Sequence, residues 1–313
     1  MYESLINAVN DYIEETGIDS FDDIALSLHA SEIFLDEKDF NFRYKYKRKY
    51  SINQCEKLVR EFLSLLNLSY LEHFNMRKSD GTIIYDYSNP YETAYSCYNF
   101  EEERRVIYIP VTGTIEDAYS IVHELFHDIN LDIEKTDSMS RNFFSECLSY
   151  LGELLFSDFL SSKGTFESKT VDNSNMFYMR RKALEVNFNL NLINLYLNNG
   201  YIDDFMIKNL IVSYPEQYID DIREIIYFIS SEEELTLEEE ECYVLSSLVA
   251  SYMYDRIKSD EKNLNELFDL NEVLSDYDMF QVLNYLGLDN DGTDLTESSY
   301  NLLRNNYKKF IRR

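Results

Sequence analysis

The sequence predicts a mostly α-helical protein with a small β-sheet edge. Among 313 residues there are only eight Gly and three Pro, which leaves little turn material for an all-β sandwich. Apolar residues make up 45% of the chain, enough to bury a sizeable core, and their spacing is helical over most of the length. No repeat or Pro-rich linker divides the sequence. We therefore expect one domain over 1–313, with helical parts at 1–80 and 166–313 and a mixed part at 81–165.

The charge balance excludes some partners. With 29 Lys+Arg against 58 Asp+Glu, the formal charge of −29 would repel a polyanion, so we expect no nucleic-acid partner. No apolar run reaches 18 residues, and the N-terminus lacks the basic and apolar regions of a signal peptide. These two observations predict a cytoplasmic protein with no membrane partner. The basic segment Arg43 to Tyr50 is interpreted as a neutralised strand or turn. The four cysteines lack paired spacing and are expected to be free, mostly buried thiols.

Apolar periodicity predicts the first elements. One helix begins near the N-terminus and breaks at Gly17, and a second amphipathic stretch covers about 21–28. A longer helix is expected from Ser51 to about Met76, followed by a turn at 79–81.

Two short β segments follow, at about 93–98 and 104–109, the second rich in β-branched and aromatic residues. The next helix should run to about Asn130, with Thr114 and Asp117 capping each other's backbone N–H groups.

Further helices are expected to follow. One should span about 141–160, and others should begin from about 176, with breaks at Gly200 and Pro215. The acidic block 232–241 is interpreted as a solvated turn and helix start.

The pentapeptide His123-Glu124-Leu125-Phe126-His127 carries the chemistry. Residues i and i+4 share one face of a helix, so both imidazoles can bind one metal ion while Glu124 reaches a metal-activated water. This pattern is rare by chance in a chain with four histidines.

A catalytic zinc needs a third protein ligand and an open position. His29 and His73 lie on amphipathic segments and are weaker candidates than a carboxylate. Glu146 is the better one, because apolar neighbours predict its burial and a buried carboxylate is costly without a partner. Glu153 lies two turns further on the same face and is expected to orient a ligand histidine.

These segments resemble the M3 zinc metallopeptidases, the family of oligoendopeptidase F and thimet oligopeptidase. Residues Thr112 to His127 are similar to that family's active-site helix, and Phe144 to Leu155 to its third-ligand helix. The likeness is looser over Ser51 to Ser96 and over Leu283 to Tyr300.

The resemblance implies a zincin-like helical fold, one Zn²⁺ per chain held by His123, His127 and Glu146, and a peptide or protein substrate lying along the sheet edge. It covers only the catalytic half of a typical member, so the enclosing N-terminal half is expected to be missing.

The sequence departs from the family pattern at several points. Phe126 stands where the family usually has Gly, and this large side chain should crowd the helix. The loop before Glu146 is also shorter than usual. The late segment that stabilises the reaction intermediate in the family corresponds here to the acidic block, which contains no histidine. Tyr243, and less favourably Tyr252 or Tyr254, is the best match to one of its tyrosines.

The sequence thus predicts a zinc-dependent endopeptidase of oligopeptides or exposed protein segments, with Glu124 as general base and Tyr243 as a hydrogen-bond donor to the oxyanion. One alternative is a catalytically impaired zinc-dependent peptide-binding or scaffold protein. Another is a selective endoprotease that acts on folded or larger protein segments. Cleavage preference and oligomeric state are not predicted.

Overall fold

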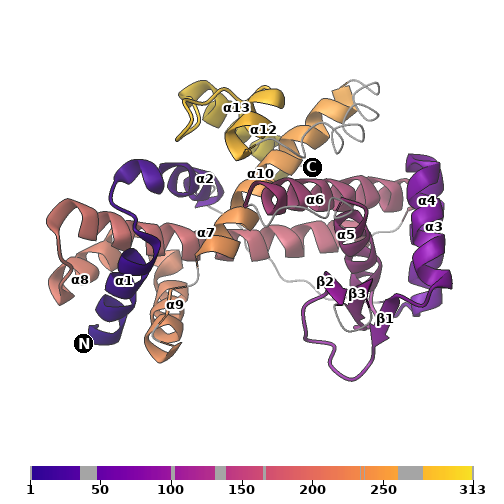
Figure 1. Ribbon diagram of the computed structural model, residues 1–313, viewed down its shortest axis with the longest axis horizontal. Coiled ribbons are helices and arrows are strands. Elements are labelled where there is room, and N and C mark those ends of the chain that lie inside the picture. The colour runs from indigo at the N-terminus through magenta and orange to yellow at the C-terminus, as the bar shows by residue number, and fades with distance from the viewer. Residues whose placement is uncertain are drawn as a thin grey trace. The chain divides into compact units, whose positions relative to one another are not determined.

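The computed structural model describes residues 2–35, 48–99, 103–130, 139–164, 167–232, 234–235, 237–259 and 278–311 (Figure 1). Within these ranges the chain is mostly helical and contains one three-stranded sheet, which confirms the predicted fold class. None of the helices in these ranges is both long and apolar enough to cross a lipid bilayer.

The chain forms two compact units that alternate along the sequence. The sheet unit comprises Asn41–Met176 and Val249–Met279, and the helical unit comprises Met1–Phe40, Phe177–Leu248 and Phe280–Arg313. These boundaries differ from the three expected parts, and the single domain remains a prediction. Two long helices contribute residues to both units: α7 (Glu167–Asn199) and α10 (Glu238–Ser259).

The sheet unit is built around helix α5. This helix packs against α6, α3 and the strands β2 and β3. The elements of this unit are α3 (Ile52–Leu66), α4 (Leu68–Ser79), β1 (Ile83–Asp86), β2 (Tyr95–Asn99), β3 (Arg104–Pro110), α5 (Glu116–Asn130) and α6 (Met139–Ser162), and Figure 1 shows α3 and α4 side by side.

The prediction of a single helix from Ser51 to Met76 is wrong, because the helix is interrupted at Asn67. Ser51 caps α3 in a capping box with Gln54. At Asn67 the backbone is extended, with φ −160° and ψ 133°, and its side chain accepts a hydrogen bond from the N–H of Ser69. A side-chain oxygen that satisfies a free helical N–H favours a new helix start, so α4 begins there.

The sheet has the strand order β1-β3-β2. The two predicted strands are confirmed as β2 and β3, which pair antiparallel with Tyr95 opposite Tyr108. Strand β1 was not predicted, and it pairs parallel to β3 with Ile83 opposite Ile107. Ile107 and Ile109 are fully buried, so the central strand is anchored in the core.

Helix α5 runs to Asn130 as predicted, but its start differs from the prediction. The buried Asp117 carboxylate accepts hydrogen bonds from the Thr112 N–H at 2.8 Å, the Thr112 hydroxyl at 2.6 Å and the Gly113 N–H at 3.0 Å. The reciprocal Thr114–Asp117 pair is therefore wrong, because the carboxylate is bound by the N–H groups of Thr112 and Gly113 in a turn where Gly113 is left-handed (φ 72°).

The helical unit contains α1 (Glu3–Thr16), α2 (Ala25–Leu35), α8 (Asp204–Ser213), α9 (Ile219–Glu232), α12 (Met279–Tyr285) and α13 (Glu297–Ile311). The breaks at Gly17, Gly200 and Pro215 are confirmed. The acidic block starts at Glu232, the last residue of α9, and its residues Glu238–Glu241 open α10. The basic segment Arg43 to Tyr50 lies mostly outside the described residues.

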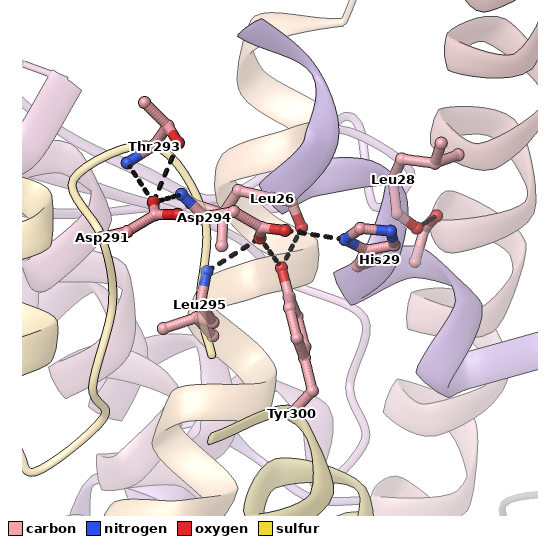
Figure 2. Close-up of polar contacts among 9 residues, drawn as sticks. Leu26, Leu28, His29, Asp291, Thr293, Asp294, Leu295 and Tyr300 are labelled. Carbon is pink, nitrogen blue, oxygen red and sulfur yellow. Dashed lines mark hydrogen bonds and ion pairs between the residues drawn. The ribbon is translucent and has the colours of Figure 1, made fainter. Parts of the chain in front are cut away.

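Side chains of the loop before α13 form hydrogen bonds with α13 and with α2 (Figure 2). Asp291 accepts hydrogen bonds from the backbone of Thr293 and Asp294, which closes the loop on itself. Asp294 then lies 2.9 Å from Nδ1 of His29 and accepts a hydrogen bond from the Tyr300 hydroxyl. His29 is thus used to hold α2 and this loop together.

Candidate metal centre

Helices α5 and α6 bring three of the predicted residues to one point. His123 and His127 lie one turn apart on α5, and Glu146 faces them from α6. One ligand atom from each residue lies within 4.8 Å of the other two. The Nε2 atoms of the histidines are 3.0 Å apart, and Glu146 Oε1 lies 3.1 Å from Nε2 of His127.

The outer nitrogen of each imidazole is held by a neighbour on α6. Nδ1 of His123 lies 2.6 Å from Oε1 of Glu153, and Nδ1 of His127 lies 2.7 Å from the hydroxyl oxygen of Ser145. An ionised carboxylate can only accept, so Nδ1 of His123 carries a hydrogen and, in the neutral ring, Nε2 presents its lone pair to the cluster.

The donor set fits a divalent cation. Oε2 of Glu146 is a buried atom with no hydrogen-bond partner, and it lies 3.6 Å from Nε2 of His123. Two imidazole nitrogens and a carboxylate oxygen that converge in this way repel one another unless a cation or protons lie between them. Histidine nitrogen and glutamate oxygen are also ligands that zinc accepts.

Without a metal, the same side chains favour protonated imidazole beside an ionised carboxylate. Burial raises the pKa of Glu146, but the adjacent imidazoles of His123 and His127 outweigh it and lower the pKa to about 2. Burial lowers the pKa of His123, but the nearby carboxylates of Glu146 and Glu153 raise it well above 6.5. The cluster therefore favours positive charge beside the Glu146 carboxylate.

Glu124 lies next to the cluster and is only 5% exposed. Burial raises the pKa of its carboxyl, and the charges of His123 and His127 partly oppose that rise. A buried carboxylate with a raised pKa is able both to accept a proton and to release it, as a general base requires.

Two polar residues of the site were not predicted from the sequence. Ser145 holds His127, and its only sequence signal was its place beside Glu146. Asn175 on α7 donates a hydrogen bond of 2.6 Å to Oε2 of Glu153, which fixes the carboxylate that faces His123. No local pattern around Asn175 indicates this role.

Phe126 is accommodated by a glycine on the facing helix. A Cβ atom added to Gly152 would lie 3.1 Å from three ring atoms of Phe126, so a larger residue would crowd that ring. The ring of Tyr70 lies on the same phenylalanine, with 5.1 Å between centroids. The crowding expected from Phe126 is therefore relieved by Gly152 on α6.

The predicted tyrosines occupy different surroundings. Tyr243 is half-buried on the part of α10 that belongs to the helical unit, and its role in catalysis remains a prediction. Tyr252 and Tyr254 are buried in the part that belongs to the sheet unit, and the Tyr254 hydroxyl donates to Asp158. Tyr150, which was not predicted, packs edge-on against the His123 ring, with 5.3 Å between centroids.

Comparison with known proteins identifies the fold. No family model and no curated protein matches the sequence. Solved structures match with TM-scores of about 0.6. A protein assigned as oligoendopeptidase F from Bacillus anthracis is 11% identical, with a TM-score of 0.62 and coverage of 97% of this chain and 56% of that one. A protein assigned as a peptidase from Chlamydophila abortus is 18% identical, with a TM-score of 0.61 and coverage of 99% and 54%. Pz peptidase A, solved with an inhibitor, is 12% identical, with a TM-score of 0.60 and coverage of 86% and 50%.

The chain therefore has a peptidase fold. More narrowly, it has the fold of the oligoendopeptidase F type, which confirms the resemblance to M3 peptidases at the level of the fold. It spans about half the length of the solved structures that it matches.

Proposed function

We propose that this chain is a zinc-dependent endopeptidase that hydrolyses peptide bonds in oligopeptides or exposed protein segments. The observation that carries the proposal is the convergence of His123, His127 and Glu146, with the buried Glu124 beside them. The likeness in fold to solved peptidases supports the same class of activity.

In this proposal His123, His127 and Glu146 hold one zinc ion per chain. When bound, zinc supplies a Lewis acid that polarises a carbonyl oxygen and lowers the pKa of water. Glu153 holds the His123 ring through Nδ1, and Ser145 holds the His127 ring in the same way. These contacts fix the two rings before substrate arrives, which lowers the cost of ordering the site.

Glu124 is the proposed general base. Its carboxylate takes a proton from the attacking water and delivers it to the nitrogen of the leaving amine. The raised pKa that burial gives this carboxyl lets it hold the proton between the two steps. Tyr243 is proposed to donate a hydrogen bond to the oxyanion of the intermediate.

Strand β2 is the proposed place for the substrate backbone. It lies at one edge of the described sheet and pairs only with β3 there, so its outer N–H and C=O groups face no strand of that sheet. An extended peptide can add to such an edge by main-chain hydrogen bonds.

The competing hypothesis is a zinc-dependent peptide-binding or scaffold protein without turnover. It rests on the acidic block 232–241, which has no histidine where the resemblance implies one. Zinc binding is common to both hypotheses, and only hydrolysis separates them.

The test is hydrolysis of a quenched peptide library by the purified chain, with and without a chelator. The proposal expects cleavage that stops with the chelator, returns with zinc, and is absent from His123→Ala. His29→Ala is the matched control, because it removes another histidine that pairs with a carboxylate, and it should cleave normally. Zinc binding without any cleavage would favour the scaffold hypothesis.

A further inference from the structure

A second buried polar cluster begins at the residue after His127. Asp128 is fully buried and lies in the last turn of α5, but its carboxylate contacts α4 rather than the metal centre formed by α5 and α6. Lone buried carboxylates are rare, so the groups that surround this one indicate what it does.

Two side chains of α4 bind the Asp128 carboxylate. Arg77 donates from Nε to Oδ2 at 2.6 Å and from a terminal nitrogen to Oδ1 at 3.0 Å, which is a two-point contact. Nε2 of His73 lies 2.5 Å from Oδ2 of the same carboxylate. Both side chains are largely buried, with 13% and 16% of their surface exposed.

A third element holds the backbone of the same turn. The guanidinium of Arg105 on β3 donates to the carbonyl oxygen of Asp128 at 3.2 Å. Carbonyls in the last turn of a helix have no partner within the helix, and a cation there is favourable. The final turn of α5 is thus held from α4 through a side chain and from β3 through its backbone.

We infer that Asp128, Arg77 and His73 form a positioning cluster that sets the rotation of the last turn of α5 and thereby aims Nε2 of His127 at the metal. This inference rests on the proposed function. It does not make Asp128 a ligand or a catalytic residue, because its carboxylate acts only through the helix that carries His127.

The geometry shows why such a cluster matters. Side chains reach about 5–6 Å from a helix axis, so a rotation of about 10° moves a ring nitrogen by about 1 Å. Metal–ligand distances are held within about 0.2 Å. Among the contacts described for the His127 ring, Ser145 is the one group that holds its outer nitrogen. A loosened last turn would therefore misplace this ligand.

The experiment measures zinc affinity by chelator competition and the absorption spectrum of the cobalt-substituted protein, in wild type and Asp128→Asn. We expect zinc affinity to fall by about 10-fold or more, the range seen when groups that orient metal ligands are removed, and the cobalt bands to shift. Asp117→Asn is the matched control, because Asp117 is a buried carboxylate that anchors the opposite end of α5. It should lower the melting temperature and leave both metal readouts close to wild type.

If Asp128→Asn does not fold, a milder pair of variants tests the same inference. His73→Leu removes the donor to Asp128, whereas His73→Gln keeps an N–H in a similar place. The inference expects weaker zinc binding in the first variant and recovery toward wild type in the second.

The experiment separates a failure of the positioning role from a failure of the proposed function. If wild type binds zinc but Asp128→Asn keeps the same affinity and cobalt spectrum, or if Asp117→Asn weakens binding equally, the positioning role is wrong and the proposed function stands. If wild type binds neither metal, the proposed function is wrong and this inference fails with it.

Discussion

Helix α5 carries two buried carboxylates one turn apart, and their surroundings are opposite. No described residue forms a direct ion pair with Glu124, and burial raises its pKa more than the nearby charges of His123 and His127 lower it. Burial also acts to raise the pKa of Asp128, but hydrogen bonds from His73 and Arg77 reverse this and lower it. The comparison shows that burial alone does not define the role of an acidic residue. A carboxylate without a direct ion pair is suited to move protons, and one that two basic side chains bind is suited to hold structure.

The largest expected effect is on catalysis through Glu124. Glu124→Gln should lower kcat by about 10²–10⁴-fold, because the amide cannot accept the proton of the attacking water. Zinc content should stay at the wild-type value, since Glu124 is not among the converging ligand atoms. Turnover and bound zinc are measured on the same sample, and a variant that cleaves at the wild-type rate would show that the general base has been misassigned.

The next effect concerns the partners of Asp128. Arg77→Met keeps the length of the side chain but leaves a buried carboxylate with less compensation, which should lower the free energy of unfolding by about 3 kcal/mol. Urea unfolding measures the loss. Arg223→Met is the control, because the Arg223–Asp220 pair is largely exposed and should change stability by less than about 1 kcal/mol. Equal losses in the two variants would remove the distinction drawn for Asp128.

The lowered pKa of Asp128 predicts how the free energy of unfolding changes with pH. A depressed folded-state pKa adds stability above the unfolded value of 3.8, and this stability is lost as pH falls through the folded pKa. The difference in unfolding free energy between wild type and Asp128→Asn, both metal-free, should thus be full at neutral pH and shrink below pH 3.8. A difference that stays constant down to strongly acidic pH would contradict the assignment.

The smallest effect has the opposite sign and belongs to Glu124. Its raised pKa means that the folded state binds more protons, so stability is lost as pH rises from 4.5 through the folded pKa. Glu124→Gln should therefore raise the melting temperature of the metal-free protein modestly at neutral pH, and the gain should vanish below pH 4.5. Calorimetry across this pH range measures the change in melting temperature. A variant that is less stable than wild type at neutral pH would contradict the raised pKa of Glu124.

The residues of α5 that form the centre were predictable because helical geometry alone places His123 and His127 on one face. Glu146 and Glu153 were also predictable as candidates, since their seven-residue spacing puts them on one face of the next helix. Each of these predictions used a regular spacing within one helix. The metal itself, and the roles of these residues in catalysis, remain predictions.

The contacts that hold this centre were not predictable from spacing. Asn175 approaches Glu153 from α7, and Arg77 approaches Asp128 from α4, 51 residues earlier in the chain. Gly152 makes room for Phe126, a match of sizes that appears only when two helices are packed. Strand β1 is four residues long, too short for its alternation to stand out.

The most direct test of the central claim is metal analysis of wild type and Glu146→Ala, with cleavage of a quenched peptide library by both. The account predicts one zinc per chain in wild type, and loss of both zinc and chelator-sensitive cleavage in the variant. A wild-type protein that purifies without metal, takes up none when zinc is supplied and does not cleave would contradict it.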